Sequence, residues 1–505
     1  MTAILSELAK HAPVAGHRPW PRHLVDAPTW TAVAPALGEG AADLLSLWAD
    51  EAHVHLALRS PAHPTPLVVS LDVKNATYPS VGLHHPAALR LERAIRDLHG
   101  IAPAELPDAR PWLDHGAWEL RAPLGARASA ELRDPADYVF LPVHGEGLHE
   151  IPVGPVHAGI IEPGHFRFTA NGEIVVRLEE RLGYVHKGID GLLAGADLEG
   201  AGRIVARISG DSTVAYSFAF ARAIEAALEI AVPPRAAVLR GVTAELERVA
   251  NHLGDIGAIC NDAAFTLNHA HCGILRERVL AACGRAFGHR LMMDRVVPGG
   301  VAADLMAGHA RMILDTLDEI MPWFADVVRV YDGTPSLQDR TCGTGILQPA
   351  LAERWAAGGF VGRASGRGFD ARRDVAYPPY DDAAFNVPVY RTGDVDARVW
   401  VRIREVEASV DLLRRWLAAL PEGSIRTALP AIASAREGIA LVEAFRGDVL
   451  LWLRLAPDGR VARCHARDPS WLQWPLLEAV IEGNIVADFP LCNKSFNCSY
   501  SGHDL

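Results

Sequence analysis

A long amphipathic helical segment in the middle of the chain constrains the fold more than any other feature. Over residues 241–260, apolar side chains recur at spacings of three and four and form one stripe: Val242, Leu246, Val249, Leu253 and Ile256. Ionisable side chains lie beside that stripe: Glu245, Arg248, His252 and Asp255. Buried charges at this density need partners, so we expect the helix to border an internal polar seam.

The rest of the chain divides into a region before this helical block and a mixed region after it. Helical periodicity dominates residues 211–415, and a helix at 213–231 should stop at Pro233 and Pro234. Before the helical block, the sequence predicts a strand at 67–73, a helix at 85–100 that ends at Gly100, and a hairpin of strands 159–168 and 173–178 around Asn171 and Gly172. After it, the sequence predicts strands at 448–455 and 461–466, a helix near 474–482 and an extended tail.

These patterns predict an α+β fold built from two domains. We expect a small α+β domain over residues 1–135, a linker rich in Ala, Pro, Gly and charge over 136–152, and a large, mainly helical domain with β hairpins over 153–505. At 505 residues the chain exceeds one ordinary core.

The composition argues against several functional classes. A formal net charge of −12 speaks against non-specific nucleic-acid binding, and we expect no nucleic-acid partner. The first 13 residues carry charges and do not resemble a secretory signal. The apolar helical pattern at 306–328 is interrupted by charges, so no membrane span is expected: Arg311, Asp315, Asp318 and Glu319. The cysteine count of seven is odd and no export signal is recognised, which argues against a disulfide framework and favours the cytoplasm; none of the cysteines forms a Cys-x-x-Cys pair.

Several short strings, collinear from about residue 70 to the end, resemble two related families. The strings Tyr78-Pro79-Ser80 and His85-Pro86-Ala87 resemble the smaller quinone-module subunit of respiratory complex I. The later strings resemble the larger quinone-module subunit and the large subunit of energy-converting NiFe hydrogenases: Gly154-Pro155-Val156-His157, Gly183-Tyr184-Val185-His186, Glu245-Leu246-Glu247-Arg248, Gly288-His289-Arg290, Asp339-Arg340-Thr341 and Gly483-Asn484-Ile485. A chain that joins both parts resembles the fused large subunit of formate-hydrogenlyase-type complexes.

This sequence lacks the four cysteines that bind the metals in the hydrogenase family. A NiFe site needs four thiolates, because soft, deprotonated sulfur binds nickel and iron and a neutral alcohol does not replace it. The family supplies them from two Cys-x-x-Cys pairs, and the matching positions here are Ser209, Ser212, Ser499 and Gly502. Cys498 stands beside the second pair, but one thiol does not make a binuclear site. The sequence also ends level with complex I relatives, without the tail that nickel hydrogenases remove. We expect no nickel.

The resemblance to complex I is incomplete as well. That family associates a histidine and a tyrosine with the quinone head group, and Ile161 and Gly210 stand at those positions. Glu162 matches a glutamate that hydrogenases use to pass protons. The resemblance therefore implies proton chemistry at Glu162 but leaves the substrate open.

Each candidate residue has a structural alternative. Ser209, Asp211 and Ser212 precede the helix that begins at Thr213, so N-capping competes with a catalytic role for Asp211. Glu162 either relays protons or pairs with a neighbouring arginine. His157 is either a titrating or a structural histidine.

The remaining candidates are expected near a cavity or a cluster. His186 is either a cofactor-facing or a structural histidine. Arg207 either faces a partner's iron–sulfur cluster or forms a surface ion pair. Arg363, Asp370 and Arg372 either line the central cavity or form an internal ion-pair network.

We therefore expect a subunit of a membrane-bound, complex I-like or hydrogenase-like oxidoreductase. It would carry electrons from a partner's 4Fe–4S cluster to a quinone or similar acceptor and couple this to ion translocation, with no metal or cofactor of its own. The resemblance implies three kinds of partner: a small 4Fe–4S subunit, a ferredoxin-like subunit and integral membrane antiporter-like subunits. NAD(H) and quinone would act at the level of the complex, on the cytoplasmic side of the inner membrane. The alternatives are a hydrogenase with unusual ligands and a non-catalytic scaffold.

Overall fold

The computed structural model describes residues 7–8, 10–60, 65–126 and 138–505, and its fold is α+β as predicted. The N-terminal region forms a four-stranded sheet in the order β2, β5, β4, β3 (Arg22–Val25, Leu67–Asp72, His53–Arg59, Asp43–Ala49). Alternate side chains of this sheet face two different cores. One face packs with helices α2 (Ala27–Gly38) and α3 (Leu89–His99), and the other presents Trp48 to the C-terminal sheet.

The C-terminal sheet joins the two ends of the chain. Its order is β1, β13, β14, β15 (His17–Arg18, Arg436–Ala444, Gly447–Leu455, Val461–Arg467), so a strand from the N-terminal region pairs with a C-terminal one. The Trp48 ring stacks on His465 with 5.2 Å between ring centroids and lies 5.8 Å from Trp452. The predicted domain boundary stays a prediction, but β1 already crosses from one region to the other.

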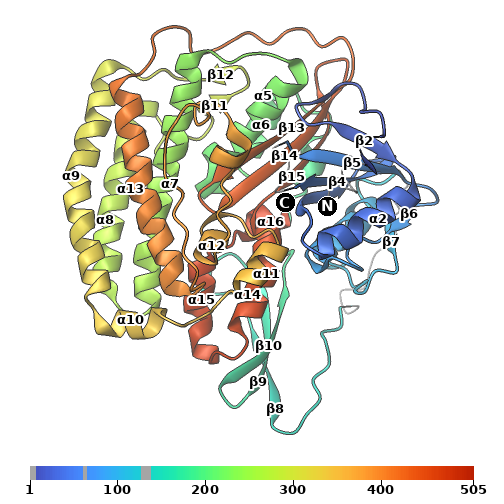
Figure 1. Cartoon of the computed structure of the whole chain (residues 1–505), viewed down its shortest axis with the longest axis horizontal. Coiled ribbons are helices and arrows are strands. Elements are labelled where there is room, and N and C mark those ends of the chain that lie inside the picture. The colour runs from blue at the N-terminus through green and yellow to red at the C-terminus, as the bar shows by residue number, and fades with distance from the viewer. Residues whose placement is uncertain (1–6, 9, 61–64, 127–137) are drawn as a thin grey trace.

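Helices dominate the middle of the chain, as the sequence predicts. Four long helices form a bundle beside the C-terminal sheet (Figure 1): α7 (Pro234–Asp262), α8 (Thr266–Phe287), α9 (Ala307–Asp332) and α13 (Val395–Ala418). Helix α6 (Thr213–Leu228) packs on β13 and β14. Helix α7 starts at Pro234, earlier than its apolar stripe indicates, because proline suits the first helical position.

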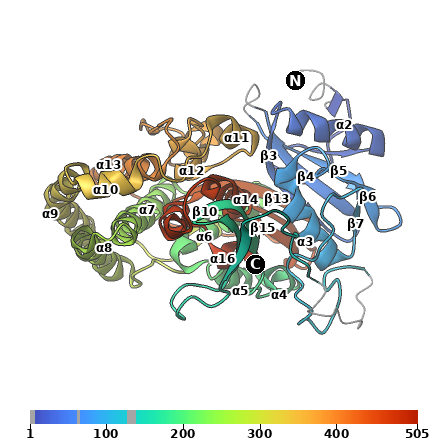
Figure 2. The ribbon, with the colours of Figure 1, turned by 90° about the horizontal axis from the view of Figure 1, so that it is seen from below.

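A three-stranded meander and two short C-terminal helices complete the part of the fold that carries the site. The meander is β8, β9 and β10 (Leu148–Val153, His165–Asn171, Ile174–Arg181), so the predicted turn is present, the first strand starts later than predicted, and β8 begins inside the predicted linker. The predicted extended tail is wrong, because α15 (Phe489–Phe496) and α16 (Tyr500–Asp504) follow α14 (Ser470–Ile481). Figure 2 shows β10, α14 and α16 between the bundle and the N-terminal sheet.

The remaining elements are short connections. They are β6 (Thr77–Pro79), η1 (Pro86–Ala88), β7 (Ala102–Ala104), α4 (Ile189–Leu193), α5 (Leu198–Val205), η3 (Gly210–Ser212), β11 (Val296–Val297), β12 (Gly300–Val301), α10 (Pro335–Thr341), α11 (Pro349–Arg354), α12 (Gly359–Ala364), the π-helical turn η4 (Arg372–Ala376) and η5 (Val486–Asp488).

Candidate functional site

A cavity of about 600 Å³ lies between the β8–β9 connection, the start of η3 and the C-terminal helices α15 and α16. It gathers residues that are far apart in the sequence, among them the predicted His157, Glu162, Ser209, Asp211 and Ser499. Its other polar lining residues are Asp262, Arg446, Asn493, Lys494, Asn497 and Ser501, and its apolar wall includes Val153, Ile160, Ile161, Phe166 and Phe489.

The serines at the expected ligand positions are hydrogen-bonded to one another and to a carboxylate. Ser209 Oγ lies 3.0 Å from Ser499 Oγ and donates to Asp211 Oδ1 at 2.8 Å. Ser499 Oγ also accepts the backbone N–H of Gly502 at 2.9 Å. The hydroxyl protons are therefore directed along one chain, from Ser499 through Ser209 to Asp211.

An ion pair forms part of the cavity wall. Arg446, at the turn between β13 and β14, donates to both oxygens of Asp211, at 2.7 and 2.6 Å, and to Ser212 Oγ at 3.2 Å. Burial alone would raise the pKa of the Asp211 carboxyl, but the Arg446 guanidinium outweighs it and holds that pKa below its ordinary value. Asp211 therefore stays ionised, and the Arg446 side chain is only 5% exposed.

The fourth expected ligand position has no room for a side chain. A Cβ atom at Gly502 would lie 2.5 Å from Asp468 Oδ2 and 2.9 Å from Ser499 Oγ. The Asp468 carboxylate is held in this place by the hydroxyl of Tyr216, which donates at 2.6 Å, and by the N–H of Ser470 at 2.8 Å. A carboxylate therefore fills the space that a thiolate at position 502 would need.

The predicted N-cap role of Ser209, Asp211 and Ser212 is wrong. None of these side chains caps η3 or α6. The Glu247 carboxylate on α7 accepts the N–H groups of Val214 and Ala215 instead, at 2.7 and 3.1 Å. Because a neighbouring helix supplies the cap, the hydroxyls are left to bond across the cavity wall.

Two acidic groups, Glu162 and Asp262, and Lys494 line the cavity, and Lys187 lies close to it. Glu162 Oε2 accepts the N–H of Ser501 at 3.3 Å, and the Lys187 ammonium donates to the carbonyl of Ile208 at 3.1 Å. Burial lowers the pKa of Lys187, against the opposing charge of Glu162. Burial raises the pKa of Asp262, and Lys494 opposes that shift.

The structure also shows what the sequence does not reveal about this site. Arg446 and Asp211 are 235 residues apart, and no spacing pattern links them. Asp262 has a weak signal, since it follows Asp255 by two helical turns on α7. Lys494 directly precedes the string at Ser495 that marks the second ligand pair.

Arg207 and His186 are two of the predicted residues that do not line the cavity, whereas His157 does. The Arg207 guanidinium, 49% exposed, forms two 2.8 Å hydrogen bonds to Asp294, and it lines a second cavity of about 630 Å³ together with His289 and Arg295. His186 bonds through Nδ1 to the carbonyl of Asp504 at 2.7 Å, and its ring lies 4.7 Å from that of Trp118. Burial lowers the pKa of His186. The His157 Nε2 atom contacts the carbonyl of Gly164 at 2.8 Å at the cavity wall.

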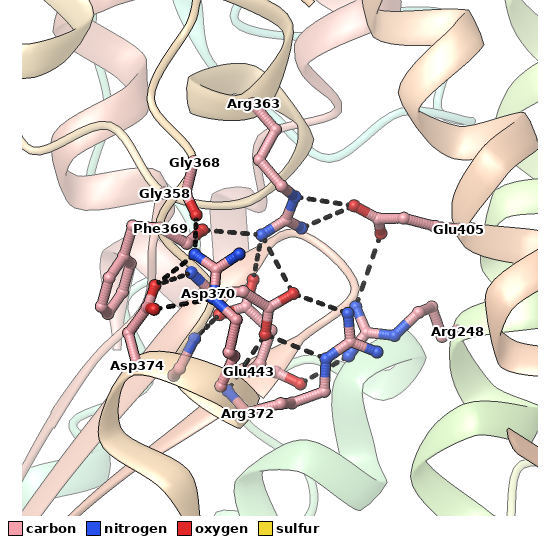
Figure 3. A network of polar contacts seen from close by, with 12 residues as sticks. Arg248, Gly358, Arg363, Gly368, Phe369, Asp370, Arg372, Asp374, Glu405 and Glu443 are labelled. Carbon is pink, nitrogen blue, oxygen red and sulfur yellow. Dashed lines mark hydrogen bonds and ion pairs between the residues drawn. The ribbon is translucent and has the colours of Figure 1, made fainter. Parts of the chain in front are cut away.

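Arg363, Asp370 and Arg372 form an internal ion-pair network rather than a wall of this cavity (Figure 3). Arg363 donates to Glu405 at 2.8 Å and to Glu443 at 2.9 Å. Arg372 donates to Asp370 at 2.6 and 3.0 Å. The network includes Glu245 and Arg248 on α7, so the polar seam predicted for that helix is confirmed.

Comparisons with known proteins identify the family. Residues 25–131 match the family described as "Respiratory-chain NADH dehydrogenase, 30 Kd subunit", and residues 263–438 match "Respiratory-chain NADH dehydrogenase, 49 Kd subunit". Formate hydrogenlyase subunit 5 of Escherichia coli (strain K12) is 29% identical over 445 residues, which are 86% of this chain and 78% of that protein. Carbon monoxide-induced hydrogenase of Rhodospirillum rubrum is 30% identical over 69% of this chain and 97% of its own length. This chain belongs to the family of complex I and membrane-bound hydrogenase large subunits.

One further relative agrees with this family, and one solved structure shares the fold. An NADH-quinone oxidoreductase subunit of Dehalococcoides mccartyi (strain ATCC BAA-2266 / KCTC 15142 / 195) is 30% identical over 66% of this chain and 92% of its own length. The fold matches a chain of the membrane-bound sulfane sulfur reductase, an archaeal respiratory membrane complex, with a TM-score of 0.68, 24% identity and coverage of 72% of this chain and 100% of that chain.

As a member of this family, the chain is a subunit of a membrane-associated, complex I-like or hydrogenase-like oxidoreductase. None of the helices formed by the described residues combines the length and the apolar character needed to cross a bilayer.

The residues at the family's metal position do not fit a NiFe centre. Three expected ligands are hydroxyls that are bonded to Asp211, Arg446 or one another, and the fourth position is filled by the Asp468 carboxylate. The Arg446 guanidinium adds a positive charge where two metal cations would have to bind. These three features together oppose nickel and iron at this place.

Proposed function

We propose that this chain receives electrons from a partner's 4Fe–4S cluster and passes them to a quinone or a similar small acceptor in the 600 Å³ cavity, without a Ni–Fe centre of its own. The observation that carries this proposal is that other residues stand at the positions of the family's metal ligands. Hydroxyls and an Asp211–Arg446 ion pair replace the thiolates, while the cavity beside them stays open. A cavity with both polar and apolar walls suits a ligand that has a polar head and an apolar body.

The polar lining supports acceptor reduction. Reducing a quinone to a quinol takes two electrons and two protons, so the cavity needs groups that deliver protons. Glu162 and Asp262 face it, and the raised pKa of Asp262 favours its protonated form nearer to neutral pH. The ionised Asp211 and the serine hydroxyls offer fixed hydrogen bonds that orient a polar head group.

The position of the second cavity supports the entry of electrons close to the acceptor cavity. Arg207 lines it and Ser209, two residues later, lines the acceptor cavity, so one short segment separates the two. His289 and Arg295 add further donors and positive charge to the face that Arg207 forms. Such groups tune an adjacent iron–sulfur cluster by charge and hydrogen bonding.

The whole complex would then contain the partners that the family implies. We infer a small 4Fe–4S subunit at the Arg207 face, a ferredoxin-like subunit that brings electrons from NADH, ferredoxin or formate, and antiporter-like membrane subunits that translocate ions. This chain would lie on the cytoplasmic side of the inner membrane and be held there by these subunits.

A conservative substitution at Glu162 tests the proposal. In the purified complex, Glu162→Gln should lower the rate of quinone reduction by about 10²-fold or more, the lower range for loss of a general acid. Glu173→Gln, an exposed glutamate of the same meander, is the matched control and should leave the rate unchanged.

The other outcomes separate the rival functions. Unchanged turnover in Glu162→Gln would favour a scaffold that only transmits conformational change. Hydrogen evolution by a complex that contains nickel would favour a hydrogenase with unusual ligands. Either result would overturn the proposal.

A further inference from the structure

A cluster of buried charges lies behind the candidate site and is not balanced. Four carboxylates share arginine partners, and the side chain of each is at most 1% exposed: Glu245, Asp370, Glu405 and Glu443. Three guanidiniums, at most 2% exposed, bind them: Arg248, Arg363 and Arg372. These seven side chains carry one more negative than positive charge, and a buried excess charge is strongly unfavourable.

Histidine does not supply the missing positive charge. His252 Nε2 lies 2.8 Å from Glu405 Oε2, and the side chain is fully buried. Burial lowers the pKa of His252, and the Arg402 and Arg248 charges lower it further, against Glu405. We therefore take His252 as neutral, donating one hydrogen bond to Glu405.

Of the four carboxylates, Glu443 is the least compensated. Glu245 accepts from Arg372, Arg248, Ser409 and Tyr380. Asp370 accepts two hydrogen bonds from the Arg372 side chain, and Glu405 binds Arg363 and His252. Glu443 has a single guanidinium partner, Arg363 at 2.9 Å, and otherwise accepts the N–H of Ala371 at 2.9 Å.

We propose that Glu443, with the neighbouring carboxylate of Asp370, binds one exchangeable proton and so forms a proton-binding site behind the acceptor cavity. The proton adds to Glu443 as a carboxylic acid, and its release restores the carboxylate. Burial, and then the charge of Asp370, raise the pKa of Glu443 to about 7. Both forms are therefore populated near neutral pH.

Groups on every surrounding element set this balance. They are Arg248, Glu245 and His252 on α7, Arg363 on α12, Asp370 before η4, Arg372 at the start of η4, Tyr377 after η4, Glu405 on α13, Asp448 on β14 with its partner Arg467, and Arg222 on α6, which lies over the Tyr377 ring.

The position of the site connects it to two surfaces. Glu443 stands at the end of β13, and Arg446 in the following turn carries the ion pair of the acceptor cavity. On the other side, Arg372 and Tyr380 line a groove of about 950 Å³ at the outside of the bundle. Glu443 and Arg446 are three positions apart in the chain, so a change of charge in the cavity occurs close to a group that can gain or lose a proton.

The first test measures the proton itself in the intact complex. Infrared pH titration with 13C-labelled glutamate should show, among the bands of buried glutamic acids, one that loses its proton near pH 7; the band of Glu247, whose pKa burial raises to about 8, is a separate one. Glu443→Gln should remove that band, and Glu229→Gln, an exposed control, should retain it. Absence of the band from the natural protein would overturn the proposal, and this measurement needs no variant to fold.

The second test uses stability. Because the folded pKa of Glu443 lies above its unfolded value, the folded state binds more protons between about pH 4.5 and 7. The thermal midpoint should therefore fall as pH rises through this window, and Glu443→Gln should reduce that decline. An identical decline in variant and natural protein would contradict the site.

A role of this proton in turnover rests on the proposed function, so it is measured in a separate experiment. If the cavity reduces an acceptor, Glu443→Gln should shift the pH profile of turnover, while Glu229→Gln should not. A band that titrates together with an unchanged pH profile would support the proton site and remove its role in turnover. A complex without acceptor reduction that retains the band would refute the proposed function alone.

Discussion

Restoring the fourth thiol should destabilise the protein unless Asp468 is removed. Gly502→Cys places a Cβ atom 2.5 Å from Asp468 Oδ2, which must move and lose the hydrogen bond from Tyr216 or from Ser470. Overpacking costs about 1–3 kcal/mol, and a lost hydrogen bond to a charged group about 1.5–3 kcal/mol. We expect a total of about 3–5 kcal/mol.

The assay is thermal unfolding of the purified protein by calorimetry. With ~2.1 cal/mol/K of unfolding entropy per residue, the 505 residues give about 1 kcal/mol per degree if they unfold together, so the midpoint should fall by about 3–5 °C. Gly210→Cys is the matched control, because a Cβ atom there meets no neighbour within 4 Å. It should shift the midpoint by less than about 1 °C, as open sites usually do.

A double variant tests the cause of this effect. Asp468→Ala removes the atoms that clash, so Asp468→Ala with Gly502→Cys should be more stable than the sum of the single effects by about 2 kcal/mol, well beyond the scatter of independent sites. Simple additivity, or a Gly502→Cys protein as stable as Gly210→Cys, would refute the claim that a carboxylate occupies the fourth ligand position.

Two further substitutions test the buried network and the second cavity. Arg363→Met leaves buried carboxylates without their cation and should lower the free energy of unfolding by about 3–5 kcal/mol. Arg404→Met breaks an exposed ion pair and should lower it by about 0–1 kcal/mol. Equal losses of stability in the two variants would contradict the burial argument. Arg207→Gln should make the midpoint potential of the partner's cluster more negative in redox titration, because a positive charge is lost from the adjacent face. Arg329→Gln, which breaks a more exposed ion pair at a residue that does not line the second cavity, is its control, and equal potentials in both variants would show that the cluster does not lie at this face.

Periodicity predicted the parts of the fold where one face of an element is buried. The apolar stripe beginning at Val242 predicted α7 and the charges beside it predicted the polar seam, because both follow from helical spacing. The C-terminal helices were missed. The segment from Cys492 to Ser501 is rich in Ser, Asn and Cys, which favour helix weakly, and tertiary packing overrides that preference.

The candidate site was predictable only where a resemblance located it. The motif positions of Ser209 and Ser499 placed both residues in the cavity, and the structure adds their 3.0 Å contact. The Arg446 partner of Asp211 was not predictable, since a hairpin turn brings it there from a distant part of the chain. The same holds for Asp468, whose importance appears only when the space at Gly502 is considered.

The central claim is that the residues at the family's metal-ligand positions do not bind a NiFe pair. Elemental analysis of the intact, purified complex, combined with a hydrogen assay on the same sample, tests it most directly. We expect nickel at the level of an unrelated control protein and no hydrogen uptake or evolution, with iron only in the amount that iron–sulfur subunits explain. One nickel per chain together with hydrogen turnover would contradict the claim.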